Sequence, residues 1–269
     1  MTTVLQTRRT MKPRRTALII ASLCTLLFSA CTRSEPSVQP VLVGAASDLA
    51  WAFQELGPLF TEETGIPIDF TMGSTGLIAH QIKNGAPFDV FAAANVSFVE
   101  QVVTSGDCDG ETQTLYARGR IVVLPYGEQE VESIDDLADE RFGRIAIANP
   151  NHAPYGAAAK QALESRGLWE SVQDRLVIGE NISQAFQFVE SGNADVAIVA
   201  LSLIRKPGRE VLVPAEFHQP IDQALAVCLH GDQTEGGRSF VTFLATPEAR
   251  QIMESYGFQL PAADGGLPE

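Results

Sequence analysis

The chain has 269 residues, and its 19 Lys and Arg against 33 Asp and Glu give a formal net charge of −14. This excess of acid argues against nucleic acid as a partner, because affinity for nucleic acid rests on neutralising phosphates with Lys and Arg. The length allows one or two domains with a sizeable hydrophobic core.

The N-terminal segment predicts an export signal. Five basic residues and no acidic one precede an apolar run from Ala17 to Ala30. This run is shorter than the roughly 20 residues that a transmembrane helix needs. The sequence FSAC at 28–31 resembles the signal of bacterial lipoproteins. The resemblance implies that residues 1–30 are removed and that Cys31 carries a lipid.

A polar tether, residues 31–40, would then join the lipid to the folded part of the protein. Without the five basic residues of the leader, 14 Lys and Arg remain against 33 acidic residues, so the mature charge is about −19. We expect an exported protein in the periplasm or at the cell surface, held to a membrane by the lipid at Cys31 alone. Whether translation starts at Met1 or Met11 stays open.

The first part of the mature chain alternates short apolar runs with segments of helical period. Strands are predicted at 41–46, 67–72 and 88–94, and a helix follows each, the third ending near residue 105. The first helix has one apolar face, made by Leu49, Ala52, Phe53, Leu56 and Phe60. The second has Leu77, Ile78 and Ile82. This alternation predicts a parallel sheet covered by helices.

A second series of the same kind follows. Strands are predicted at 120–126, 144–150, 176–180, 195–202, 210–214 and 223–231, and helices at 155–165 and 183–190. The last helix has clear end signals, because Thr246 can cap it, Pro247 can open it and Gly257 can close it. The sequence therefore predicts two α/β lobes, each built on a mostly parallel sheet. We assign residues 41–120 and 224–269 to the first lobe and 121–223 to the second.

Two cysteines remain after Cys31. Cys108 and Cys228 stand 120 positions apart and have no metal-ligand spacing. We predict two buried thiols in preference to a disulfide, and the sequence leaves their pairing open.

Four junctions between a strand and a helix share one chemistry. They are AASDL at 45–49, MGSTG at 72–76, HAPYG at 152–156 and ENISQ at 180–184, and none contains Lys or Arg. Each offers free N–H groups, and three of them add serine hydroxyls. Ligands of open α/β sheets bind beyond the carboxyl ends of the strands, so the four junctions could converge on one anion. Taken singly, Ser47, Ser74 and Ser183 are also ordinary helix N-caps.

Two catalytic readings of the second junction fail on spacing. A phosphate loop needs four residues between its glycines and a Lys after the second, whereas two residues separate Gly73 from Gly76 and Leu77 follows. A nucleophile elbow has the pattern Gly-x-Ser-x-Gly, which MGSTG does not match.

The order of these motifs is specific. The stretches AASDL, GSTGLIAHQIKNGAPFDVFAAAN, NPNHAPYGAAAKQAL, GNADVAIVALS and ESYGF together resemble the molybdate-binding proteins of bacterial ABC importers. The resemblance runs from Val41 to Phe258 and implies a two-lobed periplasmic-binding fold of type II, with a tetrahedral oxyanion in the cleft. It implies that Ser47 and Ser74 donate hydroxyl and backbone N–H bonds from the first lobe. Tyr155 and Ile182 would donate backbone N–H bonds from the second.

One donor of the family is missing. Some members place a Tyr hydroxyl on the oxyanion at the position of Ala200, and Ser202 or the backbone N–H of Asp48 could replace it. A carboxylate that faces the site would repel a dianion but could accept a hydrogen bond from a protonated oxyanion such as phosphate. We expect the backbone N–H of Asp48 to face the site and its side chain to cap the helix that begins at Leu49. If the side chain does not cap this helix, phosphate becomes the better ligand.

The resemblance implies a receptor that closes its lobes on molybdate or tungstate and hands the ion to a membrane permease driven by an ATPase. We expect a monomer with no cofactor and no metal beyond the oxyanion, and with hinges near Arg120 and Gln223. Sulfate, phosphate and other anions stay open as ligands. Iron(III) is disfavoured, because it would need several Tyr or His together and the four Tyr of this chain are scattered.

Two other classes of function compete with a receptor. A serine hydrolase would use Ser74 or Ser47 as nucleophile, His152 as base and Asp89 or Asp195 to orient the base. A surface adhesin or structural lipoprotein would explain Cys31 but would leave the four junctions without a role.

Overall fold

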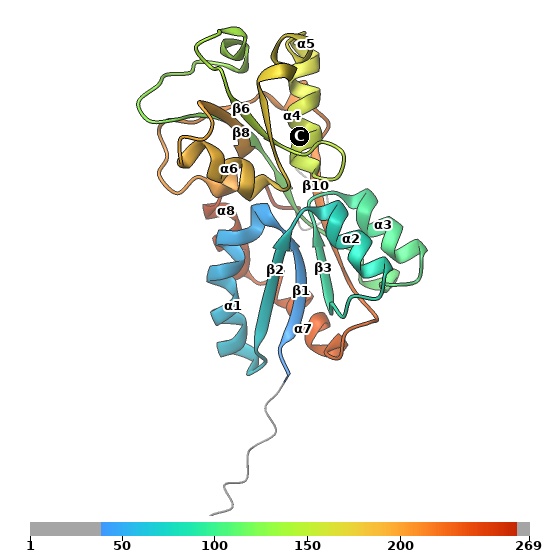
Figure 1. Cartoon of the computed structure of the whole chain (residues 1–269). Helices are drawn as coiled ribbons and strands as arrows, with labels where there is room; N and C mark the ends of the chain where they lie inside the picture. The colour runs from blue at the N-terminus through green and yellow to red at the C-terminus, as the bar shows by residue number, and fades with distance from the viewer. Residues whose placement is uncertain (1–38, 263–269) are drawn as a thin grey trace, which may run out of the picture. The chain divides into compact units, whose positions relative to one another are not determined.

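The computed structural model describes residues 39–262. The predicted leader, Cys31 and the tether up to residue 38 lie outside this range. Within the described range, no helix is long and apolar enough to cross a membrane. The fold consists of two five-stranded sheets with flanking helices, as the alternation of the sequence predicts (Figure 1).

The first sheet has the strand order β2-β1-β3-β10-β4. Its strands are β1 (Val41–Ala46), β2 (Ile68–Gly73), β3 (Val90–Ala93), β4 (Thr114–Gly119) and β10 (Ile221–Val227). The helices that follow or cover these strands are α1 (Ala50–Thr64), α2 (Thr75–Lys83), α3 (Val96–Thr104), α7 (Thr234–Leu244) and α8 (Pro247–Ser255). We call this sheet and its helices the first lobe.

The second sheet has the order β7-β6-β8-β5-β9. Its strands are β5 (Ile121–Pro125), β6 (Ile145–Ala148), β7 (Leu176–Gly179), β8 (Val196–Ala200) and β9 (Val211–Leu212). Its helices are α4 (Pro154–Ser165), α5 (Trp169–Val172) and α6 (Ile182–Glu190). We call these elements the second lobe. Short 3-10 turns complete the chain: η1 (Ser47–Leu49), η2 (Gly110–Thr112), η3 (Ile134–Ala138), η4 (Gln173–Arg175), η5 (Leu201–Leu203) and η6 (Ala215–Phe217).

Both sheets are mixed, and in each of them a single strand, β10 or β5, runs against the other four, so the sheets are mostly parallel as the sequence predicts. Strand β1 is parallel to β2 and β3, but β10 is antiparallel to β3 and β4. In the second sheet β6 is parallel to β7 and β8, and β5 is antiparallel to β8 and β9. The chain passes between the lobes twice, from β4 to β5 and from β9 to β10. The antiparallel strands, β5 and β10, are the first strands after these two passages. No α-helix lies in either passage, and only the short turn η6 precedes β10, so these strands enter the sheets against the parallel set.

The centre of the first sheet is buried on both faces, as expected for a sheet covered by helices on each side. In β3, Val90 and Ala92 pack in one apolar cluster with α1, while Phe91 and Ala93 pack in a second cluster with α2 and α3. Figure 1 shows α1 on one side of the sheet and α2 with α3 on the other. One predicted core residue is exposed: Leu77 in α2 retains 36% of its surface.

The end signals of α8 are confirmed. Thr246 is the N-cap and accepts a hydrogen bond from the backbone of Ala249, and Pro247 is the first helical residue. Gly257 follows the helix with a φ of 84°, a left-handed conformation that favours glycine.

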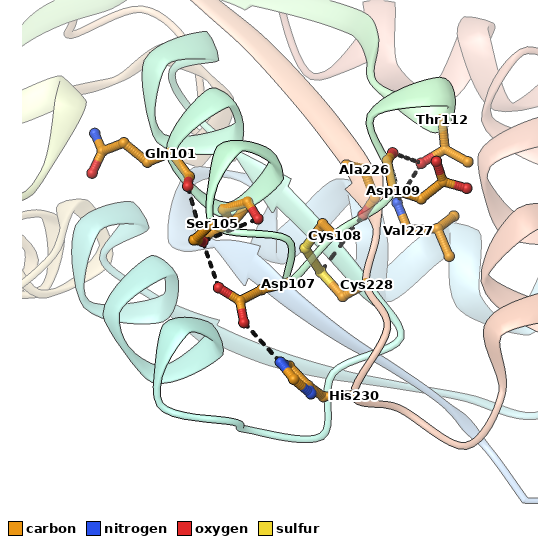
Figure 2. Close-up of a disulfide and its surroundings, with 11 residues drawn as sticks. Gln101, Ser105, Asp107, Cys108, Asp109, Thr112, Ala226, Val227, Cys228 and His230 are labelled. Carbon is orange, nitrogen blue, oxygen red and sulfur yellow. Dashed lines mark hydrogen bonds and ion pairs between the residues drawn. A yellow bond between two sulfur atoms is a disulfide. The ribbon is translucent and has the colours of Figure 1, made fainter.

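The prediction of two free thiols is wrong, because Cys108 and Cys228 form a disulfide. Figure 2 shows the bond beside the ion pair between Asp107 and His230, whose side chains lie 2.8 Å apart. The two cysteines are opposite each other in an isolated antiparallel bridge that continues β10. This bridge brings together positions 120 residues apart, a proximity that no local pattern of the sequence indicates.

Of the two residues near which we expect hinges, Arg120 lies in a passage between the lobes, whereas Gln223 lies inside a strand. Arg120 stands between β4 and β5, and its guanidinium donates to the carbonyl of Gly257 at 2.8 Å. Gln223 is fully buried inside β10, which begins at Ile221, two residues before our proposed limit of the second lobe. The limits of the lobes stay a proposal.

Candidate functional site

A small cavity lies between the helix starts of the two lobes. All four predicted junctions line it, and no Lys or Arg is among its lining residues. Ser47, Asp48, Ser74, Tyr155 and Ile182, which the sequence singles out, all lie here. The other lining residues are small, apolar or hydroxyl-bearing: Ala46, Gly73, Thr75, Ala94, Ala153 and Pro154.

The cavity lies at the positive ends of three helices. Ser74 is the N-cap of α2, Tyr155 is the second residue of α4 and Ile182 is the first residue of α6. The first N–H groups of a helix have no acceptor within the helix, and the helix dipole makes this end attractive to anions. Neutral donors from both lobes therefore surround the cavity, which is the chemistry that a small oxyanion needs.

The lobes touch each other through serine hydroxyls at the rim of the site. Ser183 donates its hydroxyl to the carbonyl of Ser47 at 2.8 Å. Ser202 is not part of the cavity lining, and its hydroxyl donates to the carbonyl of Asp48 at 2.8 Å. Ser183 is not the cap of α6, because Asn181 takes this role and accepts from the backbone of Gln184. These hydrogen bonds join the two lobes.

Asp48 does not cap a helix, so that expectation is wrong. Its Oδ2 accepts a hydrogen bond from the Tyr155 hydroxyl at 2.8 Å and another from the Gln223 amide at 2.6 Å. Its Oδ1 is buried without a hydrogen-bond partner in the described part of the chain. Burial raises the pKa of Asp48 to about 6, and the bonds from Gln223 and Tyr155 lower it only partly.

A buried polar network extends from Asp48 into the first lobe. The Tyr116 hydroxyl donates to the side-chain oxygen of Gln223 at 2.7 Å, and Gln223 also donates to the Tyr155 hydroxyl at 3.0 Å. Burial, with a further contribution from Asp48, raises the pKa of both tyrosines well above the usual range, so both remain protonated donors. Sequence reasoning missed Tyr116. A polar residue inside the apolar run QALAVCLHG, here Gln223, was the signal of a buried polar partner.

Ser74 has a partner that the receptor reading did not anticipate. Its Oγ lies 2.7 Å from Nδ1 of His152 and 2.7 Å from the carbonyl oxygen of the same residue. The backbone N–H of Gly76 donates to that carbonyl at 2.9 Å. His152 belongs to the loop before α4, so the first and second lobes meet at this point.

The contact between Ser74 and His152 matches part of the hydrolase hypothesis, but the orienting acid is elsewhere. Asp89 accepts two backbone N–H groups of the first lobe, at 2.7 and 2.6 Å. Asp195 pairs with Arg144 at 3.1 Å. No carboxylate of the described residues is hydrogen-bonded to His152. The arrangement is therefore a serine–histidine pair without the third member that orients the base.

The chain is similar in sequence and in structure to known bacterial binding proteins. Residues 41–259 match the family model described as bacterial extracellular solute-binding protein. The chain is 33% identical to the molybdate-binding protein ModA of Rhodobacter capsulatus over 220 residues, which cover 81% of this chain and 87% of the relative. It is 28% identical to a putative ABC transporter substrate-binding lipoprotein, YvgL of Bacillus subtilis, over 91% of this chain and 98% of the relative. The solved structure of the Azotobacter vinelandii periplasmic molybdate-binding protein superposes with a TM-score of 0.79 at 30% identity, and covers 82% of this chain and all of that one (100%).

Proposed function

Because the chain belongs to the family of bacterial extracellular solute-binding proteins, we propose that it captures molybdate and tungstate and delivers them to an ABC importer. One observation carries the proposal: helix starts from both lobes converge on one cavity whose lining contains hydroxyls and no Lys or Arg. The similarity to molybdate-binding relatives from Rhodobacter and Azotobacter supports the choice of ion. We assign the anion bonds to Ser47, Ser74, Tyr155 and Ile182.

Ser202 and Asp48 do not bind the ion through their side chains in this proposal. The Ser202 hydroxyl is used by the carbonyl of Asp48, so it holds the lobes together and does not contact the ion. The Asp48 side chain lies behind the anion and is hydrogen-bonded to Tyr155. The ion and its donors then form the site without a cofactor.

The same proposal covers location and partners. The protein is exported, and a lipid on Cys31 holds it to a membrane as a monomer. Its partners are the permease and the ATPase of the importer. The ion favours the closed lobes because it contacts both of them only when they are shut.

Calorimetry with the full mature chain, carrying Cys31→Ser for solubility, tests the choice of ion. We expect molybdate and tungstate to bind comparably, because they are nearly equal in size. Sulfate is smaller, so donors fixed at hydrogen-bond distance for the larger ions lose one or two charge-assisted bonds, and its affinity should be lower on the order of 10-fold to several thousand-fold.

Phosphate provides the discriminating arm of this experiment. Near neutral pH it carries a proton that needs an acceptor, and the hydroxyls and backbone N–H groups that we assign to the anion offer none. The lining does contain the Asp48 carboxyl, whose buried Oδ1 has no hydrogen-bond partner among the described residues, so this side chain is the one to vary. We expect no measurable phosphate binding, and the same order of ions in Asp48→Asn. If phosphate binds tightly and Asp48→Asn abolishes this binding, the ligand of the receptor is phosphate and not molybdate. The Asp48 carboxylate then accepts a hydrogen bond from it.

A hydrolase remains the second candidate because Ser74 and His152 are in contact. We propose no enzymatic activity, since no carboxylate orients the imidazole in the described part of the chain. Turnover of an activated ester such as p-nitrophenyl acetate separates the two functions. A rate that Ser74→Ala and His152→Leu both abolish would establish the hydrolase.

A further inference from the structure

The contact between Ser74 and His152 depends on a close approach of the backbones of the two lobes. Gly76 is the second residue of α2, and a Cβ at this position would stand 2.8 Å from the His152 carbonyl oxygen and 3.0 Å from the His152 Cβ. Any other residue at 76 would push the His152 loop away. Glycine therefore allows the second lobe to approach close enough for both the side chain and the carbonyl of His152 to reach Ser74.

The hydrogens at this contact can be counted. A serine hydroxyl has one hydrogen to donate and lone pairs to accept, while a carbonyl oxygen only accepts. When the Ser74 hydroxyl donates to the carbonyl of His152, the 2.7 Å contact with Nδ1 needs its hydrogen from the imidazole. In this arrangement Nδ1–H of His152 donates to Oγ of Ser74.

An oxyanion in the cavity changes only one of these bonds. The Ser74 hydroxyl can turn its hydrogen from the His152 carbonyl to the anion, and the carbonyl still accepts from the N–H of Gly76. The bond from Nδ1–H to Oγ persists and polarises the hydroxyl, because hydrogen bonds in a chain strengthen one another in a buried site. The opposite tautomer, in which Nδ1 accepts from Ser74, would take the hydrogen that the anion needs.

We propose that His152 is a positioning residue for anion capture: its Nδ1–H, presented by the second lobe, turns the Ser74 hydroxyl of the first lobe toward the oxyanion. This inference rests on the proposed receptor function, since the anion is the acceptor of that hydroxyl. The bond forms only when the lobes are closed. Closure therefore makes the Ser74 hydroxyl a stronger hydrogen-bond donor. His152 itself does not touch the ion.

A double-mutant cycle tests the inference. We compare the molybdate affinity of the wild type, His152→Leu, Ser74→Ala and the double variant by calorimetry. His152→Leu should weaken binding on the order of 10-fold, because the hydroxyl loses its polarising donor. In the Ser74→Ala background the same substitution should cost less than about 2-fold, since residues that act through one bond are not additive.

Two further variants separate positioning from packing. His152→Asn places an amide N–H near the position of Nδ1 and should bind within about 3-fold of the wild type. His80→Leu, a matched change on the exposed face of α2, should leave affinity unchanged. Unliganded melting curves for each variant separate a loss of binding from a loss of folding.

The results decide whether His152 positions Ser74 and which ion the receptor binds. Wild-type affinity in His152→Leu, failure of His152→Asn to restore binding, or an equal loss in the Ser74→Ala background would each overturn the positioning role. If the wild type binds sulfate or phosphate in place of molybdate, the receptor's ion is wrong, and the same cycle with the bound ion decides the role of His152. If none of the ions binds, both proposals fail.

Discussion

Asp48→Asn should change how the stability of the protein depends on pH. The carboxyl is 1% exposed, has no cationic partner among the described residues, and its pKa rises from 3.8 to about 6 because of burial. The folded state therefore binds the proton more tightly than the unfolded state. The stability from this proton is fully present below pH 4 and is lost as pH rises to about 6.

The size of the effect follows from the shift. One pKa unit corresponds to 1.36 kcal/mol, so the wild type loses about 3 kcal/mol of unfolding free energy between pH 4 and pH 7.5 through this group. Asparagine cannot titrate, and its amide oxygen can accept the bonds from Tyr155 and Gln223 in place of Oδ2. The amide can also change the free energy of unfolding by an amount that does not depend on pH. This amount cancels, because the test measures how the difference between the two proteins changes with pH. This loss of unfolding free energy is an upper limit, because the lobes can separate and expose Asp48 to water before they unfold.

Urea denaturation of both proteins at pH 4, 5, 6 and 7.5 measures this difference. Relative to the wild type, Asp48→Asn should gain about 3 kcal/mol between the two ends of the series, equivalent to roughly 6–12 °C in Tm for a protein of this size. Asp135→Asn is the control, because the exposed pair with Arg166 lowers the pKa of Asp135 and gives a small effect of opposite sign. A difference that stays flat from pH 4 to 7.5, or that favours the wild type at high pH, refutes the argument.

Three further predictions concern the anchor, the site and the disulfide. Cys31→Ser should release the protein from membranes, and unchanged partition into detergent would contradict lipidation. Ser74→Ala removes one charge-assisted bond, so molybdate affinity should fall about 10-fold to 150-fold while unliganded stability changes by about 1 kcal/mol; equal affinity would remove Ser74 from the site. Replacing Cys108 and Cys228 by Ser opens a loop of 120 residues, which should cost about 2–5 kcal/mol of stability in urea unfolding. A double variant as stable as the wild type would show that the bond does not constrain the chain.

The sequence by itself determined the order of the elements. Helical and strand periods are local, so the apolar face of α1 and the alternation of the two lobes could be predicted from short windows. The ends of α8 followed from Thr246, Pro247 and Gly257 for the same reason, because caps and turns depend on residues within one helical turn. Strand β4 escaped prediction: TLYARG has no sustained alternation and owes its place to pairing with β10.

Tertiary structure decided the partners of the polar side chains. Ser74 meets His152 across 78 positions, and Asp48 meets Gln223 across 175. Each residue type was compatible with an ordinary cap or a solvated loop, so no window of the sequence could choose between these roles. The choice depends on how closely the two lobes approach, which is set by packing and by a glycine at 76 where a larger residue would collide with the facing loop. Burial then changes the chemistry of Asp48, because removing a carboxyl from water without a cation raises its pKa.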